Sequence, residues 1–192
     1  AAVFVQHPNF FGQLEKVHEI REISAAKGAM MIASVDLLTL GILAPPADYG
    51  ADLAIGESQP LGIPMAFGGP VAGFFAASDK YVRYMPGRLV GETVDKDGKR
   101  AFTLTLQTRE QHIRREKATS NICTNQTLLA HRATVYMTLL GPHGIREVGE
   151  QCLQRSHHAA KLLAEIPGFK PAFDGPFVKE FVVECPRPAR EI

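Results

Sequence analysis

The sequence predicts an α/β fold, in which helices cover both faces of a mostly parallel sheet. Short apolar runs alternate with helical patterns over the first half of the chain, and the 192 residues are 45% apolar. That length and composition allow one sizeable core and the start of a second. The alternation stops near residue 85, and a hinge follows at Gly141-Pro-His-Gly144. We place the domain boundary at this hinge and expect residues 1–141 to form part of a large α/β domain. Residues 142–192 are expected to begin a small C-terminal α+β domain.

The first half supplies four candidate strands, all apolar and bounded by turn residues. They cover residues 2–6, 29–35, 51–56 and 71–77. Between the first two strands, Leu14, Val17, Ile20 and Ile23 recur at helical spacing, and Gly28 ends that helix. Shorter helical segments are expected at residues 37–43 and 79–84.

The second half changes character. Residues 89–94 and 100–107 flank a turn at residues 95–98 and predict a β-hairpin. Two long helices are expected at residues 125–140 and 145–166, with a hinge at Gly141-Pro-His-Gly144 between them. A last strand is expected at residues 177–185.

Composition excludes several classes of protein. The formal net charge is +1, which gives no support for nucleic-acid or membrane binding, and no apolar run is long enough to span a membrane. The three cysteines, Cys123, Cys152 and Cys185, are spaced too widely for a zinc site or a disulfide framework. We expect no metal and a cytoplasmic protein, or a mitochondrial one in a eukaryote. The first residues read as a buried strand without an initiator Met, so we expect a piece of a longer protein.

Asp36 closes the second predicted strand at its carboxyl end, where open α/β sheets bind ligands. Two interpretations stay open. The carboxylate caps the following turn, or it pairs with the cationic ring nitrogen of a bound cofactor.

A charged segment, residues 109–117, carries four cations and two anions around His112. Such a run is typical of a solvated helix face with local ion pairs. It leads into Ala118-Thr-Ser-Asn121, and arginines beside hydroxyl and amide groups suit phosphate or carboxylate recognition.

Three runs are similar to a known family. They are Gly62-Ile-Pro-Met-Ala-Phe-Gly-Gly-Pro70, Met85-Pro-Gly-Arg-Leu-Val-Gly91, and Leu106-Gln-Thr-Arg-Glu-Gln-His-Ile-Arg-Arg-Glu-Lys-Ala-Thr-Ser-Asn-Ile-Cys-Thr124. The chain resembles the glycine decarboxylase P-protein of the glycine cleavage system. The resemblance implies the large domain of a fold type I enzyme that uses pyridoxal phosphate (PLP). It also implies glycine decarboxylation, with transfer of the aminomethyl group to the lipoyl arm of H-protein.

The resemblance further implies which half of the P-protein this chain represents. P-proteins contain two homologous halves or subunits, and only the carboxyl half, or subunit 2, carries the lysine that binds PLP in the turn after the third strand. Gln59 and Pro60 stand in that turn, and neither side chain can form a Schiff base. We therefore expect the amino half, or subunit 1, with no catalytic residue of its own and a degenerate site at Asp36 and Gln59. PLP would be bound covalently by the partner half, and the isolated chain would be inactive.

The resemblance also suggests residues that reach the partner. Thr119, Ser120 and Asn121 resemble a loop that contacts the PLP phosphate of the neighbouring subunit; alternatively, Thr119 caps the next helix. Arginines and a histidine would orient the substrate carboxylate, line the lipoyl path or lock the interface; these residues are Arg88, Arg109, His112, Arg114 and Arg115. The competing hypothesis is a non-catalytic scaffold with a degenerate PLP site.

Overall fold

The computed structural model describes residues 1–118 and 126–192. They form two compact units, one made of Ala1–Ala76 with Thr127–Ile192 and the other of Ala77–Gln126. Each unit is described by itself. The predicted boundary after Gly141 is a different division of the chain, and it stays a prediction.

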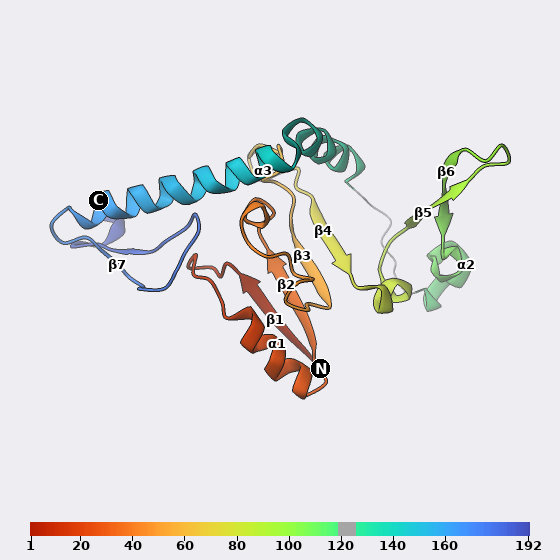
Figure 1. The fold of residues 1–192 in the computed structure, drawn as a ribbon, viewed down its shortest axis with the longest axis horizontal. Coiled ribbons are helices and arrows are strands. Elements are labelled where there is room, and N and C mark those ends of the chain that lie inside the picture. The colour runs from red at the N-terminus through yellow and green to blue at the C-terminus, as the bar shows by residue number, and fades with distance from the viewer. Residues whose placement is uncertain (119–125) are drawn as a thin grey trace. The chain divides into compact units, whose positions relative to one another are not determined.

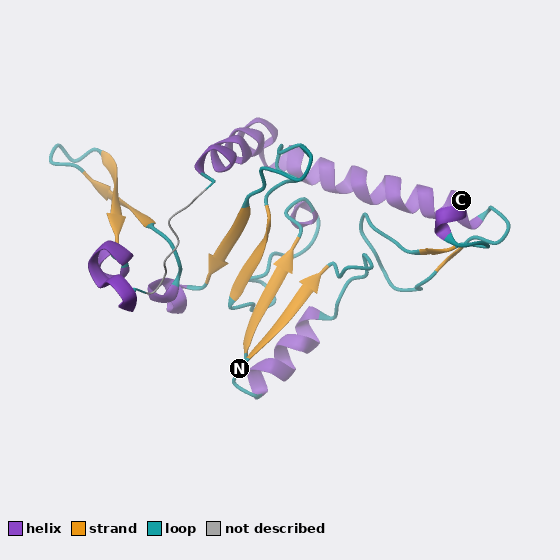
Figure 2. Ribbon diagram, turned by 180° about the vertical axis from the view of Figure 1, so that it is seen from behind, coloured by secondary structure: helices purple, strands orange, loops and turns teal. Residues whose placement is uncertain are grey.

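The larger unit is built on a sheet whose strands follow the order β1-β2-β3-β4 (Figure 1). The strands are β1 (Ala2–His7), β2 (Met30–Val35), β3 (Leu53–Glu57) and β4 (Gly73–Ala77). β1 pairs with β2, and β2 with β3, in parallel, whereas the arrow of β4 runs opposite to those of β1 and β2 (Figure 2). The four predicted strands and the mostly parallel sheet are confirmed.

Helix α1 (Val17–Ala26) packs on one face of this sheet. Val17 joins the buried side chains of Val5, Met31 and Val35, which alternate along the strands as a half-covered sheet requires. The opposite face of β1 is more open, since Phe4 is 60% exposed.

A buried carboxylate joins the helix to the sheet. Asp52 is 4% exposed; it accepts the Met31 N–H at 2.9 Å and pairs with Arg21 of α1 at 3.1 Å. Burial of a carboxylate costs little when such partners replace its water.

The long helical segment α3 (Thr127–Ala164) contains two helices joined at a kink. Gly141 has φ 60° and ψ −176°, a conformation open essentially to glycine alone, and Pro142 follows it. The sequence therefore predicted this hinge correctly. The part of α3 after the kink packs on the short helix η1 (Thr39–Gly41), which follows β2.

The predicted strand at residues 177–185 is wrong in most of its length. Only β8 (Val183–Glu184) pairs there, with β7 (Lys170–Pro171). Residues 176–180, which we call the strap, instead bond to other parts of the unit. The Leu14 N–H donates to Pro176 O at 2.9 Å, and Gln13 forms a bridge with Phe177. These backbone groups find partners outside a sheet, so apolar content alone misassigned the segment.

The smaller unit contains the predicted hairpin, β5 (Leu89–Val94) and β6 (Arg100–Thr105). Its turn is held by Asp95, whose Oδ1 accepts the N–H groups of Asp97 and Lys99, while Gly98 adopts φ 76°. Short helices flank the hairpin; they are η2 (Asp79–Tyr84), η3 (Gln107–Arg109), α2 (Gln111–Arg114) and η4 (Arg115–Lys117). None of the described residues of this unit is buried. Within residues 1–118 and 126–192, every helix is too short or too polar to span a bilayer.

Candidate functional site

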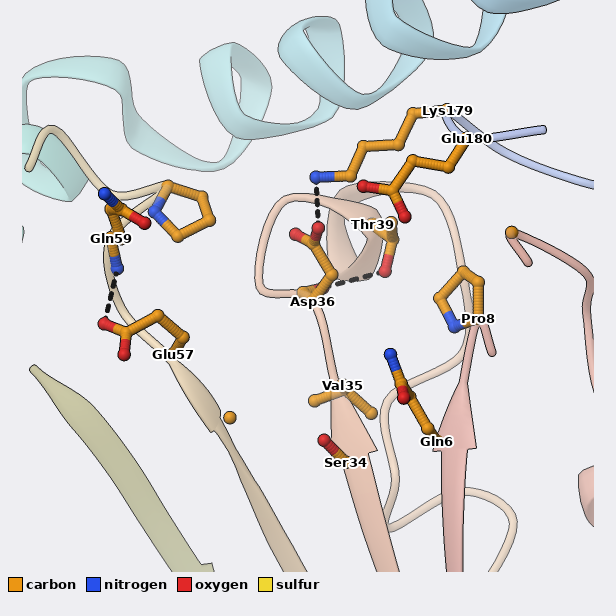
Figure 3. Close-up of a pocket in the computed structure, with 13 residues that line it drawn as sticks. Gln6, Pro8, Ser34, Val35, Asp36, Thr39, Glu57, Gln59, Lys179 and Glu180 are labelled. Carbon is orange, nitrogen blue, oxygen red and sulfur yellow. Dashed lines mark hydrogen bonds and ion pairs between the residues drawn. The ribbon is translucent and has the colours of Figure 1, made fainter. Parts of the chain in front are cut away.

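A pocket of about 260 Å³ lies at the carboxyl ends of β1, β2 and β3 (Figure 3). This is the edge at which open α/β sheets place their ligands. The strand ends and the segments that follow β1, β2 and β3 supply most of its wall, and the strap supplies the rest. Its lining residues are Gln6, Pro8, Gly12, Ser34, Val35, Asp36, Thr39, Gly56, Glu57, Gln59, Pro60, Lys179 and Glu180.

Asp36 has both of its carboxylate oxygens engaged. Oδ1 accepts the Leu38 N–H at 2.9 Å, which closes an Asx turn ahead of η1. Oδ2 forms an ion pair with Lys179 Nζ, and the two side chains are only 23% and 25% exposed. One carboxylate oxygen therefore holds the turn after β2, and the other is paired with a lysine of the same chain.

Lys179 reaches the pocket because the strap is fixed on both sides of it. Val178 is 2% exposed, and its carbonyl accepts the Ser156 hydroxyl at 2.6 Å. His157 stacks on the Phe177 ring with centroids 4.0 Å apart. Glu180 lies so close to Gly12 that a Cβ there would stand 1.8 Å from the Glu180 carbonyl oxygen. The packing of its neighbours thus directs Lys179 toward Asp36.

No sequence motif indicated Lys179, although it is the pocket's only cation among the described lining residues. The residue lies far along the chain from β2, in a segment read as a strand. The apolar Val178 precedes the polar Lys179 and Glu180, but nothing in this local pattern indicated which element the two polar side chains would contact.

The remaining charged residues of the described lining are acidic. Glu57 Oε1 accepts the N–H groups of Gln59 and Ala72, each at 3.1 Å. Glu180 adds a third carboxylate, and its side chain lies beside that of Lys179 (Figure 3). Three carboxylates therefore face one ammonium group in this pocket.

These residues do not fit PLP. The turn after β3 offers the amide of Gln59 and the ring of Pro60 instead of an amine. The carboxylate that could pair with a ring nitrogen is engaged by Lys179, and the excess of negative charge disfavours a phosphate. The same described residues contain no group of three side chains able to hold a metal ion.

The other predicted site residues lie in the smaller unit, whereas Asp36 and Gln59 line the pocket of the larger one. Arg109 Nη2 donates to Gly87 O at 2.6 Å, and Arg114 Nε donates to Thr108 O at 3.0 Å. The Nε and Nη1 atoms of Arg109 are buried and have no hydrogen-bond partner among the described residues.

Three further predicted site residues of the smaller unit, Arg88, His112 and Arg115, are exposed. Thr119, Ser120 and Asn121 lie outside the described residues, so their contact with a phosphate stays a prediction.

The mostly parallel sheet defines an α/β protein, and its structural neighbours show that the fold is that of fold type I PLP enzymes. Two remote structures share the fold. They are a Burkholderia pseudomallei sphingosine-1-phosphate lyase, at TM-score 0.62 and 12% identity over 96% of this chain and 40% of that one, and mouse CSAD in apo form, at TM-score 0.59 and 11% identity over 92% of this chain and 35% of that one.

Closer comparisons give the family. Residues 1–184 match the family model of the glycine cleavage system P-protein, so the chain belongs to that family. The crystal structure of an inhibitor-bound glycine decarboxylase (P-protein) of the glycine cleavage system superposes at TM-score 0.94. It is 48% identical and covers 99% of this chain and 44% of that one.

Two bacterial relatives carry the name "Probable glycine dehydrogenase (decarboxylating) subunit 1". The Chlorobium phaeobacteroides protein is 56% identical over the whole chain, and the Carboxydothermus hydrogenoformans protein is 58% identical over 96% of it. The chain spans 43% and 41% of the length of these relatives.

Proposed function

We propose that this chain is part of subunit 1, or the amino half, of a glycine dehydrogenase (decarboxylating). The assembly removes carbon dioxide from glycine and passes the aminomethyl group to lipoylated H-protein. The observation that carries the proposal is 56% identity over the whole chain to a relative named as subunit 1 of that enzyme. The bacterial relatives also support a cytoplasmic location.

PLP would be held covalently by the lysine-bearing partner half, subunit 2, where it supplies the electron sink for loss of carbon dioxide. The absence of an amine in the turn at Gln59 and Pro60 supports this assignment, as does the engagement of Asp36 by Lys179. This chain would contribute part of the active-site wall and of the subunit interface.

Co-purification tests the proposal. The full-length polypeptide that carries this sequence should be expressed with and without the lysine-bearing half, and glycine-dependent exchange of labelled carbon dioxide should be measured with H-protein present. We expect exchange only when both halves are present. Exchange by the lysine-bearing half alone at the same rate would refute the proposal, and so would a PLP adduct that borohydride fixes to this chain.

Thr119 is our candidate for contact with the partner's PLP phosphate, with Ser120 and Asn121 as neighbouring donors. Thr119→Val should lower PLP occupancy of the assembled enzyme, because the hydroxyl donor is lost while the side-chain volume is kept. Unchanged occupancy would contradict the contact.

The ion pair between Asp36 and Lys179 in the pocket favours one competing function, a scaffold that only supports the partner half. Two arginines of the smaller unit separate the two functions, because Arg88→Gln and Arg114→Gln remove exposed cations that would meet substrate in a catalytic role. Loss of exchange with intact assembly supports a catalytic contribution, whereas loss of assembly alone supports the scaffold. Size-exclusion chromatography beside the exchange assay distinguishes these outcomes.

A further inference from the structure

The pocket at the carboxyl edge of this chain's own sheet has a cation of its own. We propose that Lys179 determines which ligands this pocket can bind. Its ammonium group forms an ion pair with the Asp36 carboxylate and thereby excludes pyridinium-type ligands, including PLP. The proposal concerns binding to this chain, so it holds or fails independently of glycine turnover.

The position of Lys179 is the first support. The residue lies in the strap between buried Val178 and Glu180, and the strap is fixed by Ser156 and by Gln13–Leu14. Its ammonium is therefore not a mobile surface charge that a ligand could displace without cost. The Asp36–Lys179 pair is about three-quarters buried, where solvent screens charges less than at the surface.

The charge balance is the second support. With Lys179 in place, the pocket holds the carboxylates of Asp36, Glu57 and Glu180 and one ammonium group. Asp36 directly follows β2, one of the two inner strands, whereas Glu57 at the end of the other inner strand already accepts two backbone N–H groups. A ring nitrogen that approached Asp36 would meet a like charge already seated there.

The geometry gives a clear expectation for removal of this side chain. Lys179→Ala would leave Asp36 with the Leu38 N–H as its remaining partner and would enlarge a cavity of about 260 Å³. A small aromatic cation should then be able to occupy the space and pair with the carboxylate. Pyridoxamine is the appropriate probe, because it has the ring nitrogen and an amine but no phosphate for Glu57 and Glu180 to repel.

Equilibrium dialysis of pyridoxamine against the full-length protein in its native assembly tests the proposal. We expect Lys179→Ala to gain one binding site per copy of this chain, with affinity at least about ten-fold above any binding by the wild type at that site. Lys179→Arg keeps the cation and should behave as the wild type. Asp36→Asn combined with Lys179→Ala removes the carboxylate and should lose the gain.

No gain in Lys179→Ala would overturn the proposal, and so would an equal gain in the double variant. If Lys179→Ala folds poorly, its melting temperature provides a second readout. Propylammonium chloride should raise it more than sodium chloride at equal ionic strength, with no such difference in the wild type. Equal effects of the two salts on the variant would likewise refute a cation site at Asp36.

Discussion

At the scale of single residues, the burial of His7 makes the stability of the fold depend on pH. It is 9% exposed at the end of β1, and its Nδ1 accepts the Glu15 N–H at 3.1 Å. Burial lowers the pKa of His7 below its usual value, against the opposing influence of the Glu15 carboxylate. The fold therefore holds the neutral ring, which alone can accept that hydrogen bond.

The sign of the pH effect follows from this lowered pKa. Above about pH 6.5 the ring is neutral in both the folded and unfolded states. Below it, the unfolded chain binds the proton first, so the free energy of unfolding should fall by at most about 1.4 kcal/mol per pH unit. Urea unfolding between pH 5 and 8 measures this slope. His7→Gln should show a shallower one, and equal slopes in both proteins would contradict the assignment.

Asp36 and Lys179 show what residue-level prediction could reach. Asp36 was found from sequence because a polar residue directly after a buried strand lies at the ligand-binding edge. Its partner was not found, because the ion pair depends on how the strap packs against α3 and the segment before α1. A contact between distant segments leaves no local pattern in either of them.

At the scale of elements, the strap packs directly against the backbone of Gly12, where Glu180 leaves no room for a side chain. Gly12 and Gly28 both have positive φ, 83° and 62°, but a Cβ would clash with Glu180 O only at Gly12 and would meet nothing within 4 Å at Gly28. The two positions therefore separate backbone strain from steric clash.

We expect Gly28→Ala to lower the free energy of unfolding by about 1 kcal/mol, which is the cost of a left-handed backbone for alanine. Gly12→Ala should lower it by about 3 kcal/mol, because the strap must also move. Chemical denaturation of both variants measures the difference. Equal losses would mean that the approach of Glu180 to Gly12 contributes nothing to stability.

The sequence predicted the elements of the sheet well, because a buried strand is itself an apolar run bounded by turns. The strand prediction failed at residues 177–185, because an apolar run can also be a buried segment that is not a strand. The apolar residues between Phe177 and Val183 predicted a strand, yet the backbone at Pro176 and Phe177 bonds to a neighbouring loop. Burial was predictable there, and the identity of the hydrogen-bond partner was not.

At the scale of the whole molecule, the two compact units differ in what stabilises them. The larger has a buried core around Val5, Met31 and Val35. The smaller has none among its described residues, and a two-stranded hairpin without a covered face is only marginally stable in water. The fold class and family could be predicted because long motifs carry them, whereas the burial of each unit could not, because it depends on contacts between distant segments. We expect the smaller unit to depend on other surfaces for its stability.

Hydrogen exchange tests that dependence. In the isolated chain, the amide protons of β5 and β6 should exchange at least about ten-fold faster than those of β2, because the hairpin opens without disrupting a core. In the assembly with the lysine-bearing half, the hairpin amides should become protected. Strong protection of the hairpin in the isolated chain would contradict this account.

The hydrogen bonds of Glu57 have a consequence for the loop of residues 58–72. One carboxylate oxygen holds the N–H groups of Gln59 and Ala72, and Ser58 N donates to Ala72 O at 2.7 Å, so the loop is closed at its base. Its far end carries the exposed side chains of Met65 and Phe67. Insertions, deletions and amino-acid substitutions at that tip can therefore accumulate. The base of the loop, and the part of the pocket wall that it forms, would keep its shape.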